Sequence, residues 1–532
     1  MEEREAVVSS SNNTENSSLA YKWVALGVVI MGAFMSILSS SLINVAIPKM
    51  MIVFSASTDQ IQWVLTGYML AMGMVIPVTG YLSDLIGTKR LYILALVVFI
   101  TGSALCGMAW SINSIIGFRV IQAVGGGILM PVSMSIIYRV IPLHQRGLAL
   151  GIWGIAAMAA PAIGPTLSGY IIEYLDWRLL FYVNIPVGLI AIFLASTLLQ
   201  EFERKSHLAF DLLGFVSSSI FCFCFLLALA QGNQEGWSSP YIISMLFIAM
   251  VFLIIFIINE LNHHQPLLNL RLFKNSVFTM SVIISSISTI GLFGGIFLVP
   301  LLLQNLMGLS PIQTGLIMFP AAIVTAIFMP IGGRLFDLIG ARPLVIVGLL
   351  VVGLGTLEIG HLTINAPFKL IIGILMVRGV GIGLSMMPAT TAGMNTVPLA
   401  EVTRASALSN VIRQISASFG IAALTAIMQR QQSYHLQGLA ENASASSPVF
   451  KSIMNNLQVH LVHQGSSLID AKMQSSMILG GWIQKQALLL AINDTFMVAG
   501  FVCLFGIPLT LFLREKRFKK EDLNYGGTGR QD

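Results

Sequence analysis

Apolar runs close to 20 residues long recur along almost the whole of this chain. The hydrocarbon core of a bilayer is about 30 Å thick, and a helix needs about 20 mostly apolar residues to cross it. Charged residues make up only 10% of the 532 residues, whereas a soluble domain carries about 25%. The sequence therefore predicts an all-α polytopic membrane protein.

The apolar runs predict fourteen membrane spans, so both termini should lie on the same side. Lys and Arg are concentrated in the segments on the side of the N-terminus, which predicts that both termini are cytoplasmic. The net charge of +6 follows from this topology and indicates no nucleic-acid partner. Residues 1–20 show no signal-peptide pattern. The expected span limits are 23–46, 61–81, 91–110, 114–137, 148–172, 180–200, 211–231, 241–259, 277–299, 314–333, 343–362, 368–393, 405–428 and 494–513.

The chain lacks the residues that several other classes of function require. There is no G-x-x-x-x-G-K-[ST] loop, which would bind the phosphates of ATP. We therefore expect neither ATP-driven pumping nor enzyme activity. The eight histidines show no ligand-like spacing, and all four cysteines fall inside apolar runs, where they are typical of packing residues. We therefore expect no metal, cofactor or disulfide.

A pattern that we expect to form a short charged loop, G-x-x-x-D-x-x-G-x-[KR], occurs twice, each time between two apolar runs. The first repeat segment, residues 80–90, lies between spans 2 and 3, and the second, residues 333–342, lies between spans 10 and 11. The pattern residues are Gly80, Asp84, Gly87, Lys89 and Arg90 in the first copy, and Gly333, Asp337, Gly340 and Arg342 in the second. A separation of eight spans predicts two six-span bundles with spans 7 and 8 inserted between them.

The expected boundaries between the parts of the chain follow from this count of spans. They are a cytoplasmic tail (1–22), a first six-helix bundle (23–200), two inserted helices (201–270), a second bundle (271–514) that includes a long outer loop (429–493), and a basic cytoplasmic tail (515–532). The outer loop mixes polar and apolar stretches.

The residue types of the repeat suit a contact that forms in one conformation and breaks in another. The first glycine allows a close helix approach, and the second makes a tight turn. The aspartate can accept hydrogen bonds from a helix N-terminus or pair with an arginine of the next helix. The alternative is an ordinary turn with a basic anchor. We expect the gating contact mainly at Asp84, because the first copy carries both Lys89 and Arg90.

Further motifs accompany the repeat, and together they resemble those of the major facilitator superfamily. More closely, the chain resembles its fourteen-span drug:proton antiporter group, the EmrB/QacA family, almost end to end. The matching stretches are residues 34–48, 62–68, 118–127, 154–169, 177–188 and 405–414. The resemblance implies the major facilitator fold and multidrug efflux, in which lipophilic molecules or antibiotics leave in exchange for protons by alternating access.

The resemblance also implies the type of membrane and the protein partners. It implies a bacterial cell (inner) membrane and, in cells with two membranes, a periplasmic adaptor protein and an outer-membrane channel as partners. It further implies that the outer loop forms a helical hairpin over the cavity mouth. A proton-coupled importer of the same superfamily is the alternative function, and a sensor that binds ligand without moving it is a third.

The resemblance assigns roles to particular residues. It implies that Arg119 in span 4 helps proton coupling, whereas by itself this arginine could simply pair with a buried carbonyl or carboxylate. It implies that a small-residue seam in span 5 closes the bundle and favours export, whereas a kinked, tightly packed helix is the alternative. The seam residues are Gly154, Pro161, Gly164, Pro165 and Gly169. The residues placed at the substrate cavity are Ser39, Asn44, Gln62, Trp63, Tyr68 and Gln122.

One departure from the family pattern concerns the proton carrier. The group commonly has an aspartate where this chain has Ser39, and a serine hydroxyl cannot carry a proton through a cycle. We expect Glu358, desolvated in span 11, or Asp494, at the outer start of span 14, to carry protons instead; both could also be rim acids in water. Arg378 and Arg413 are further candidates for structure or site. The scarcity of acids in the first half favours neutral or weakly charged lipophilic substrates over dications.

Overall fold

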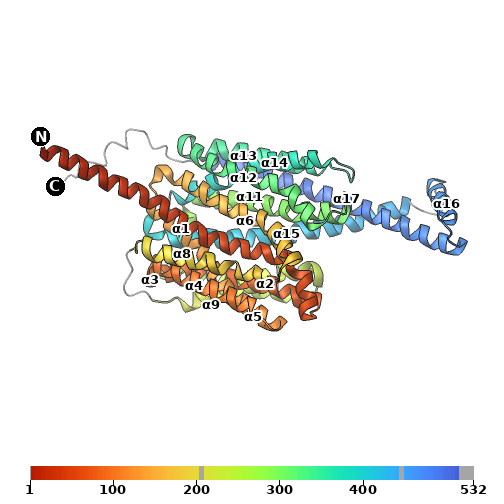
Figure 1. Cartoon of the computed structure of the whole chain (residues 1–532), viewed down its shortest axis with the longest axis horizontal. Coiled ribbons are helices and arrows are strands. Elements are labelled where there is room, and N and C mark those ends of the chain that lie inside the picture. Colours follow the sequence, from red (N-terminus) through yellow and green to blue (C-terminus); the bar gives the residue numbers. More distant parts are fainter. Residues whose placement is uncertain (1, 203–208, 443–447, 514–532) are drawn as a thin grey trace.

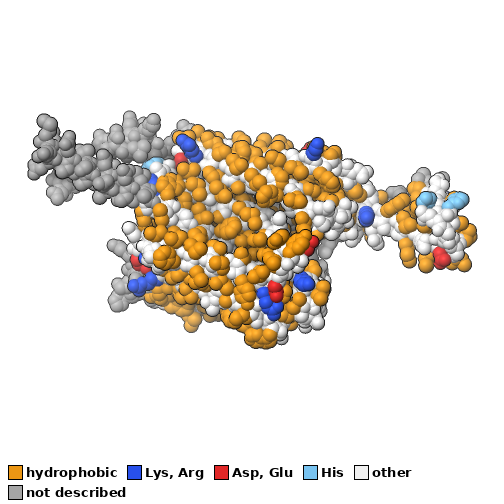
Figure 2. Space-filling view, viewed as in Figure 1, with side chains coloured by type: hydrophobic (Ala, Val, Ile, Leu, Met, Phe, Trp, Pro, Cys, Tyr) orange, Lys and Arg blue, Asp and Glu red, His pale blue; other side chains and the backbone are white. Residues whose placement is uncertain are grey.

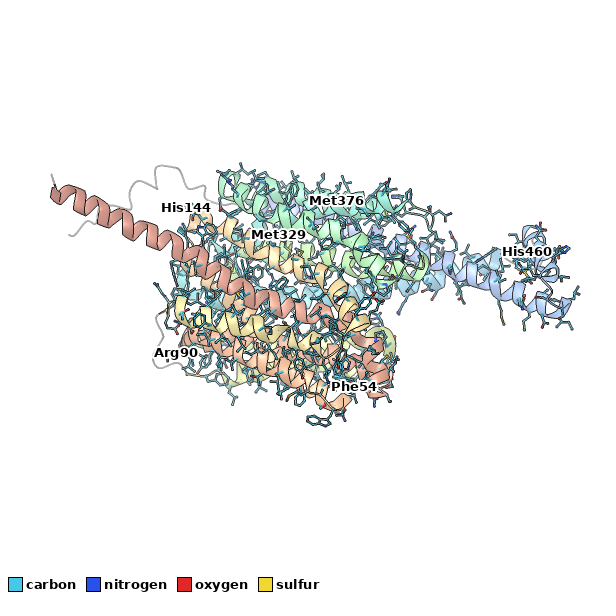
Figure 3. All side chains as sticks on the ribbon, viewed as in Figure 1. Phe54, Arg90, His144, Met329, Met376 and His460 are labelled. Carbon is cyan, nitrogen blue, oxygen red and sulfur yellow. The ribbon has the colours of Figure 1, made fainter. Side chains whose placement is uncertain are left out.

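A computed structural model describes residues 2–202, 209–442 and 448–513, so the basic tail (515–532) lies outside the described residues. Fourteen helical spans in the described chain are long and apolar enough to cross a membrane, which confirms the predicted all-helical fold. They run side by side along the long axis of the molecule (Figure 1). Arg90 and His144 mark one end of the bundle and Phe54 the other (Figure 3). We call the end with Arg90 the repeat end, and the opposite one the far end.

The helix bounds follow the expected spans. The first half contains α1 (Glu2–Phe54), α2 (Thr58–Val75) continued by α3 (Thr79–Ile86), α4 (Thr88–Gly107), α5 (Ile112–Val140), α6 (Arg146–Tyr174), α7 (Leu179–Tyr182) and α8 (Asn184–Leu198). The inserted pair is α9 (Leu212–Glu235) and α10 (Pro240–Asn262). The second half contains α11 (Ser276–Leu301), α12 (Pro311–Ile339), α13 (Ala341–Ile359), α14 (Phe368–Met394), α15 (Val402–Asn442), α16 (Pro448–His463) and α17 (Leu468–Leu509).

Serine residues begin three of the helices at the far end. Ser57, Ser111 and Ser310 each accept a hydrogen bond from the backbone three residues on, and each forms a capping box with a polar residue at that position. Such a box satisfies two backbone N–H groups that the first helical turn leaves unpaired. The connections before α2, α5 and α12 can therefore be short and still end in a well-formed helix.

The repeat segments are almost entirely helical, so the expectation of a charged loop is wrong. Residues 80–86 complete α3 and residues 333–339 complete α12. Only Gly87 and Gly340 leave the helix, with φ of 95° and 84°, and the next helix starts one residue later. Glycine is favoured in both places because it adopts positive φ without a steric penalty. The second glycine of the pattern thus makes the turn that the sequence predicted.

The two halves meet mainly along two helix pairs. From the first half, α6 packs against α12 and α5 packs against α15. Of the inserted pair, α9 packs against α2 and α15, whereas α10 packs mainly on α9 and buries only 17% of its apolar window. On the face shown in Figure 2, hydrophobic side chains cover the sides of the bundle and charged ones lie toward its ends. This distribution suits a molecule surrounded by lipid.

The predicted outer loop is helical where it is described. The last parts of α15 and the first part of α17 continue their spans beyond the bundle, and α16 packs against α17. Figure 1 shows this assembly extending away from the bundle along its long axis. The expected hairpin therefore exists but does not lie across the end of the bundle. His435 Nε2 and Asp494 Oδ2, 2.7 Å apart, join α15 to α17.

Candidate functional site

The first repeat segment contacts the second half. Asp84 is 5% exposed, and its Oδ2 lies 3.1 Å from Nη2 of Arg404, in the first turn of α15. Gly80 faces the same residue: a Cβ there would come within 2.8 Å of the Arg404 Cγ. The aspartate therefore pairs with an arginine, as predicted, but the arginine belongs to the opposite half rather than to the next helix.

The second repeat segment makes the matching contact in the other direction. Asp337 accepts hydrogen bonds from the backbone N–H groups of Gly147 (3.0 Å) and Leu148 (3.1 Å), in the first turn of α6. A carboxylate at this position also interacts favourably with the helix dipole. The backbone of Gly333 lies directly against that of Gly147.

These two contacts are equivalent. The helix α15 lies eight spans after α6, which is also the separation of the repeat segments. Each segment therefore binds the start of the corresponding helix in the opposite half, as a duplicated architecture requires. The expectation that the first copy dominates is not supported, because Asp84 and Asp337 both join the halves.

The basic residues of the repeat contact their own half. Glu201 accepts hydrogen bonds from the backbone N–H groups of Lys89 (3.0 Å) and Arg90 (3.2 Å), and so caps α4. The Lys89 ammonium donates to the Ser196 carbonyl oxygen. Arg342 donates to the carbonyl oxygen of Leu511 at 2.7 Å. These residues hold the last and third spans of each half together beside the Asp84 and Asp337 contacts.

Additional polar contacts close the repeat end of the interface. Arg146 donates to Oδ1 of Asn395 at 3.2 Å, which links α6 to the end of α14. Arg139 donates to the Thr403 hydroxyl at 3.3 Å, and the hydroxyls of Ser135 and Thr403 lie 2.5 Å apart. Opening this end would require all of these contacts between the halves to break.

We expect the Asp84–Arg404 pair to hold the repeat end closed. Asp84→Asn or Arg404→Gln should each weaken closure by about 1.5–3 kcal/mol, the range for a hydrogen bond to a charged group. The double variant should be little worse than either single one. The measurement is maleimide labelling of Ser135→Cys in a background without the native cysteines, which should become faster. Asp59→Asn, an exposed acid at the far end, is the matched control; unchanged labelling in Asp84→Asn would contradict the prediction.

Arg119 lies inside the first half with neutral partners. It is fully buried and donates to Val64 O (3.4 Å), Ser39 Oγ (3.2 Å) and Gln122 Oε1 (2.7 Å). Its guanidinium carbon lies 4.0 Å from the centre of the Tyr68 ring, a cation–π contact. No carboxylate in the described chain lies within 4.0 Å of it. The structure therefore buries a cation without a counter-ion.

Three of the residues assigned to the substrate cavity surround this arginine instead. Ser39, Tyr68 and Gln122 are each no more than 1% exposed, and Gln122 also donates to Ser39 Oγ (3.1 Å) and Ser103 Oγ (2.5 Å). They lie inside the first half because a buried guanidinium needs acceptors around it. Of the others, Asn44 is exposed, Trp63 is half-buried, and Gln62 accepts a hydrogen bond from Gln234 of α9.

Arg378 occupies the corresponding place in the second half. It lies on α14, eight spans after α5, and is 5% exposed. It donates to the hydroxyl of Thr356 (3.0 Å) and to the carbonyl oxygen of Gly291. A Cβ on Gly295 would collide with its guanidinium. Arg119 and Arg378 thus occupy equivalent spans, and each is buried and bound by neutral groups of its own bundle, although the surrounding motif differs.

The small-residue seam of α6 allows close packing on two sides. Gly154 faces Met329 of α12, whose sulfur would lie 2.6 Å from an added Cβ, and Gly169 faces Ile312. Gly164 packs against Ser41 of α1. These approaches place the seam between the halves and against the first span.

The two prolines of the seam lie within α6, and Ser41 satisfies a backbone group that they release. Because Pro165 has no N–H, the Pro161 carbonyl oxygen lacks its partner within the helix. The Ser41 hydroxyl donates to that oxygen at 3.4 Å. The first span therefore satisfies the carbonyl group that Pro165 releases inside α6.

The two acids expected to carry protons lie in different surroundings. Glu358 lies on the protein surface at the next-to-last residue of α13, so no surrounding protein buries it, and its desolvation stays a prediction. Asp494 lies within the long helix α17, rather than at the start of a span, and contacts His435. Neither lies between the halves at the repeat segments.

The sequence reasoning missed a buried acid at the end of α10. Glu260 is fully buried; its Oε2 accepts a hydrogen bond from Leu268 N, and its Oε1 has no partner in the described chain. Asp211, 3% exposed, caps α9 through Gly214 N, and a Cβ on Gly214 would meet both carboxyl groups. Acids at facing ends of two consecutive spans were the signal that could have identified this pair.

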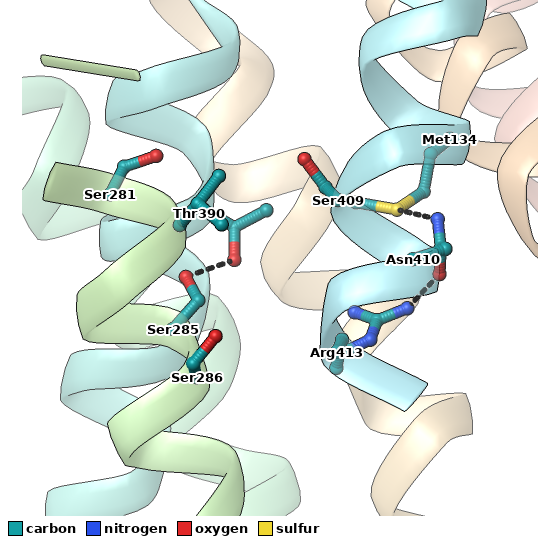
Figure 4. A pocket seen from close by; sticks show the side chains of 9 residues that line it. Met134, Ser281, Ser285, Ser286, Thr390, Ser409, Asn410 and Arg413 are labelled. Carbon is teal, nitrogen blue, oxygen red and sulfur yellow. Dashed lines mark hydrogen bonds between the residues drawn. The ribbon is translucent and has the colours of Figure 1, made fainter. Parts of the chain in front are cut away.

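A small cavity lined by both polar and apolar side chains lies between the halves. It has a volume of about 20 Å³, room for about one water. Met134 of α5 lines it from the first half (Figure 4), whereas the second half supplies residues of α11, α14 and α15. Its lining residues are Met134, Ser281, Val282, Ser285, Ser286, Thr390, Ser409, Asn410 and Arg413. The sequence had singled out only Arg413 among them.

Comparisons with known proteins agree with this architecture. A family model described as the Major Facilitator Superfamily matches residues 29–421. A Bacillus subtilis (strain 168) protein named "Uncharacterized MFS-type transporter YhcA" is 37% identical over 93% of this chain and 95% of its own. The "Multidrug transporter protein MdtP" of the same strain is 30% identical over 91% of this chain and 92% of its own. The solved proton:xylose symporter XylE shares the fold, with a TM-score of 0.59 at 15% identity over 93% of this chain and 96% of that one.

Proposed function

Because this chain belongs to the major facilitator superfamily, we propose that it is a secondary active efflux transporter that exports lipophilic small molecules in exchange for protons. The observation that supports this most directly is the pair of reciprocal contacts between the halves. Asp84 binds the start of α15 and Asp337 binds the start of α6. Both contacts lie at the same end, so breaking them together would open the interface from one side, as alternating access requires.

The direction and the membrane setting belong to the same proposal. The repeat end carries Lys89, Arg90 and Arg342, and an excess of Lys and Arg is typical of cytoplasmic segments. We therefore assign the repeat end and both termini to the cytoplasm of a bacterial cell, in its inner membrane. The far end with α16 then faces outward, where a periplasmic adaptor would bind in a cell with two membranes. The relative named as a multidrug transporter supports drug-like substrates.

We assign proton coupling to two buried groups, Arg119 and Glu260, and to the partly exposed His435–Asp494 pair. Arg119 supplies a buried charge that responds to any nearby proton movement. Glu260 and the His435–Asp494 pair are the acids that we propose to take up protons. Glu358 becomes a weaker candidate because it is exposed.

The test is transport in proteoliposomes with an imposed pH gradient and rhodamine 6G as the probe. We expect the dye to move against the proton flow, and Glu260→Gln with Asp494→Asn to reduce that coupled movement at least about tenfold. Movement of dye together with protons would instead indicate a symporter, and binding without movement would indicate a sensor. Asp59→Asn, an exposed acid with no assigned role, is the matched control, and a coupled rate unchanged in the double variant would contradict the assignment of Glu260 and Asp494.

A further inference from the structure

The hydrogen bonds among the residues that line the cavity leave some of their N–H and O–H donors unused. Ser285 and Thr390 bond to each other at 3.2 Å, and Asn410 Nδ2 donates to Ser406 O (2.8 Å) and to Met134 Sδ. Arg413 donates from one nitrogen to Asn410 Oδ1, as Figure 4 shows. A guanidinium has five N–H donors, so most of those on Arg413 remain available at the cavity wall.

Two hydroxyl groups in the wall are also available. Ser286 on α11 and Ser409 on α15 line the cavity, and neither hydroxyl bonds to a protein atom in the described chain. Together with Arg413 they line the same cavity, Ser286 from α11 and Ser409 and Arg413 from α15 (Figure 4). Met134 and Val282 supply apolar wall beside them.

The cavity has no acid to balance Arg413. No carboxylate in the described chain lies within 4.0 Å of this arginine. The helices α5, α11 and α14 contain no Asp or Glu at all, and the only one in α15 is Glu441, next to the last residue of that helix. The same four helices carry Arg119, Arg139, Lys369, Arg378, Arg404 and Arg430 besides Arg413. Arg413 is therefore a cation in the cavity wall with no carboxylate beside it in the described chain.

We propose that Arg413, with Ser286 and Ser409, binds a carboxylate or similar anionic oxygen group of the transported molecule. This inference rests on the proposed transport function and narrows its substrate class to amphipathic organic acids and zwitterions. A guanidinium matches the geometry of a carboxylate and binds it most strongly where water is excluded. Asn410 holds the guanidinium in position through its Oδ1. Arg119 and Arg378 cannot take this role, because their own bundles enclose them.

The size of the cavity fits a site between transport steps. At about 20 Å³ it holds a water and not a drug molecule. Its wall includes Met134 of the first half and eight residues of the second, so it widens when the halves separate. A substrate anion would then replace water at Arg413, while its apolar part contacts Met134 and Val282.

The experiment compares two dyes that differ by one ester group. Rhodamine 6G is the ethyl ester of rhodamine 19, which carries a free carboxylate. Binding to the purified full-length protein in lipid nanodiscs is followed by fluorescence anisotropy. We expect the acid to bind at least about tenfold more tightly than the ester, Arg413→Met to remove that preference, and Arg413→Lys to retain part of it. Arg430→Met, an exposed arginine on the same helix, should leave the preference unchanged.

Each remaining outcome decides the proposal. Equal binding of the two dyes by the natural protein overturns it, as does a preference that survives Arg413→Met. If Arg413→Met is not recovered as a folded protein, the Ser286→Ala and Ser409→Ala double variant replaces it and should reduce the preference about three- to tenfold; an unchanged preference there overturns the proposal. If the protein prefers the acid in binding but transports neither dye in proteoliposomes, the transport function is refuted and the anion site stands. If it transports dye but shows no preference for the acid, the anion site is refuted and the transport function stands.

Discussion

Replacing Gly333 or Gly147 with alanine should slow transport by about tenfold to a hundredfold while the protein still folds. A Cβ on Gly147 would collide with the Gly333 carbonyl oxygen, and a Cβ on Gly333 would collide with that of Gly147. Both of these oxygens belong to the backbone, so neither can move away by a change of side-chain rotamer. One turn further along, a Cβ on Gly151 would lie 2.5 Å from the Met329 carbonyl oxygen. The added methyl group can be accommodated only if α6 and α12 move apart at the repeat end.

The expected magnitude follows from the cost of overpacking. Extra atoms in a packed contact cost about 1–3 kcal/mol, and every 1.4 kcal/mol is about a tenfold change in population. Each variant should therefore favour the state that is open at the repeat end by about tenfold to a hundredfold, and the rate of dye transport should fall in proportion. Maleimide labelling of Ser135→Cys should become faster in the same variants, because that residue lies in the interface that fails to close.

The matched controls are glycines in open surroundings. An added Cβ on Gly117 of α5 or Gly373 of α14 has no other atom within 4 Å. Gly117→Ala and Gly373→Ala should therefore transport at the natural rate, and a helix interior favours alanine over glycine in any case. Normal transport by Gly333→Ala would show that the closed repeat end is not an obligatory step.

A second large effect is expected from adding an acid beside Arg119. The Ser39 hydroxyl accepts a hydrogen bond from this buried guanidinium at 3.2 Å, so Ser39→Asp would place a carboxylate within contact distance. In the natural protein the new charge gains a partner. In an Arg119→Met background the same carboxylate is buried alone, which costs about 3–5 kcal/mol. Ser39→Asp should thus be tolerated or stabilising by itself, and strongly destabilising in the double variant.

Thermal unfolding in detergent measures this double-mutant cycle. We expect a coupling energy of about 3–5 kcal/mol between Ser39→Asp and Arg119→Met. The Tm of the double variant should therefore fall by more than the sum of the changes in the two single variants. Ser39→Asn is the control, because it has nearly the same shape without the charge and should show little coupling. A double variant as stable as Ser39→Asp would mean that Arg119 turns away from position 39, contrary to the contact described here.

Much of the fold was predictable because bilayer physics leaves few choices for a chain of this kind. Runs of about 20 apolar residues must cross as helices, so the number of spans could be counted directly. The pattern glycines could also be interpreted correctly, since positive φ at Gly87 and Gly340 and close approach at Gly80 and Gly333 are the usual reasons for glycine at a helix end. The prediction of a loop failed because both segments remain helical up to a single glycine.

The site was less predictable, because which face of a helix meets which neighbour depends on contacts between distant segments. Ser39 and Gln122 belong to motifs that suggested a substrate cavity, yet they surround Arg119 inside one half. The sequence placed Glu358 in an apolar span, but only the structure puts it on the protein surface at the helix end. Glu260 was overlooked because its burial comes from α9 and the Leu268 backbone, which approach it only in the folded chain.

By itself, the sequence determined the membrane setting, the fourteen spans and the duplication, since all three follow from local hydropathy and from a pattern repeated along the chain. Only the tertiary structure decided that Asp84 binds Arg404 and that Asp337 binds the start of α6, because each contact joins residues that are far apart in the chain. It also decided which arginines are enclosed within a half and which one faces the cavity between the halves. That difference depends on helix rotation, and helix rotation is set by the packing of the neighbours.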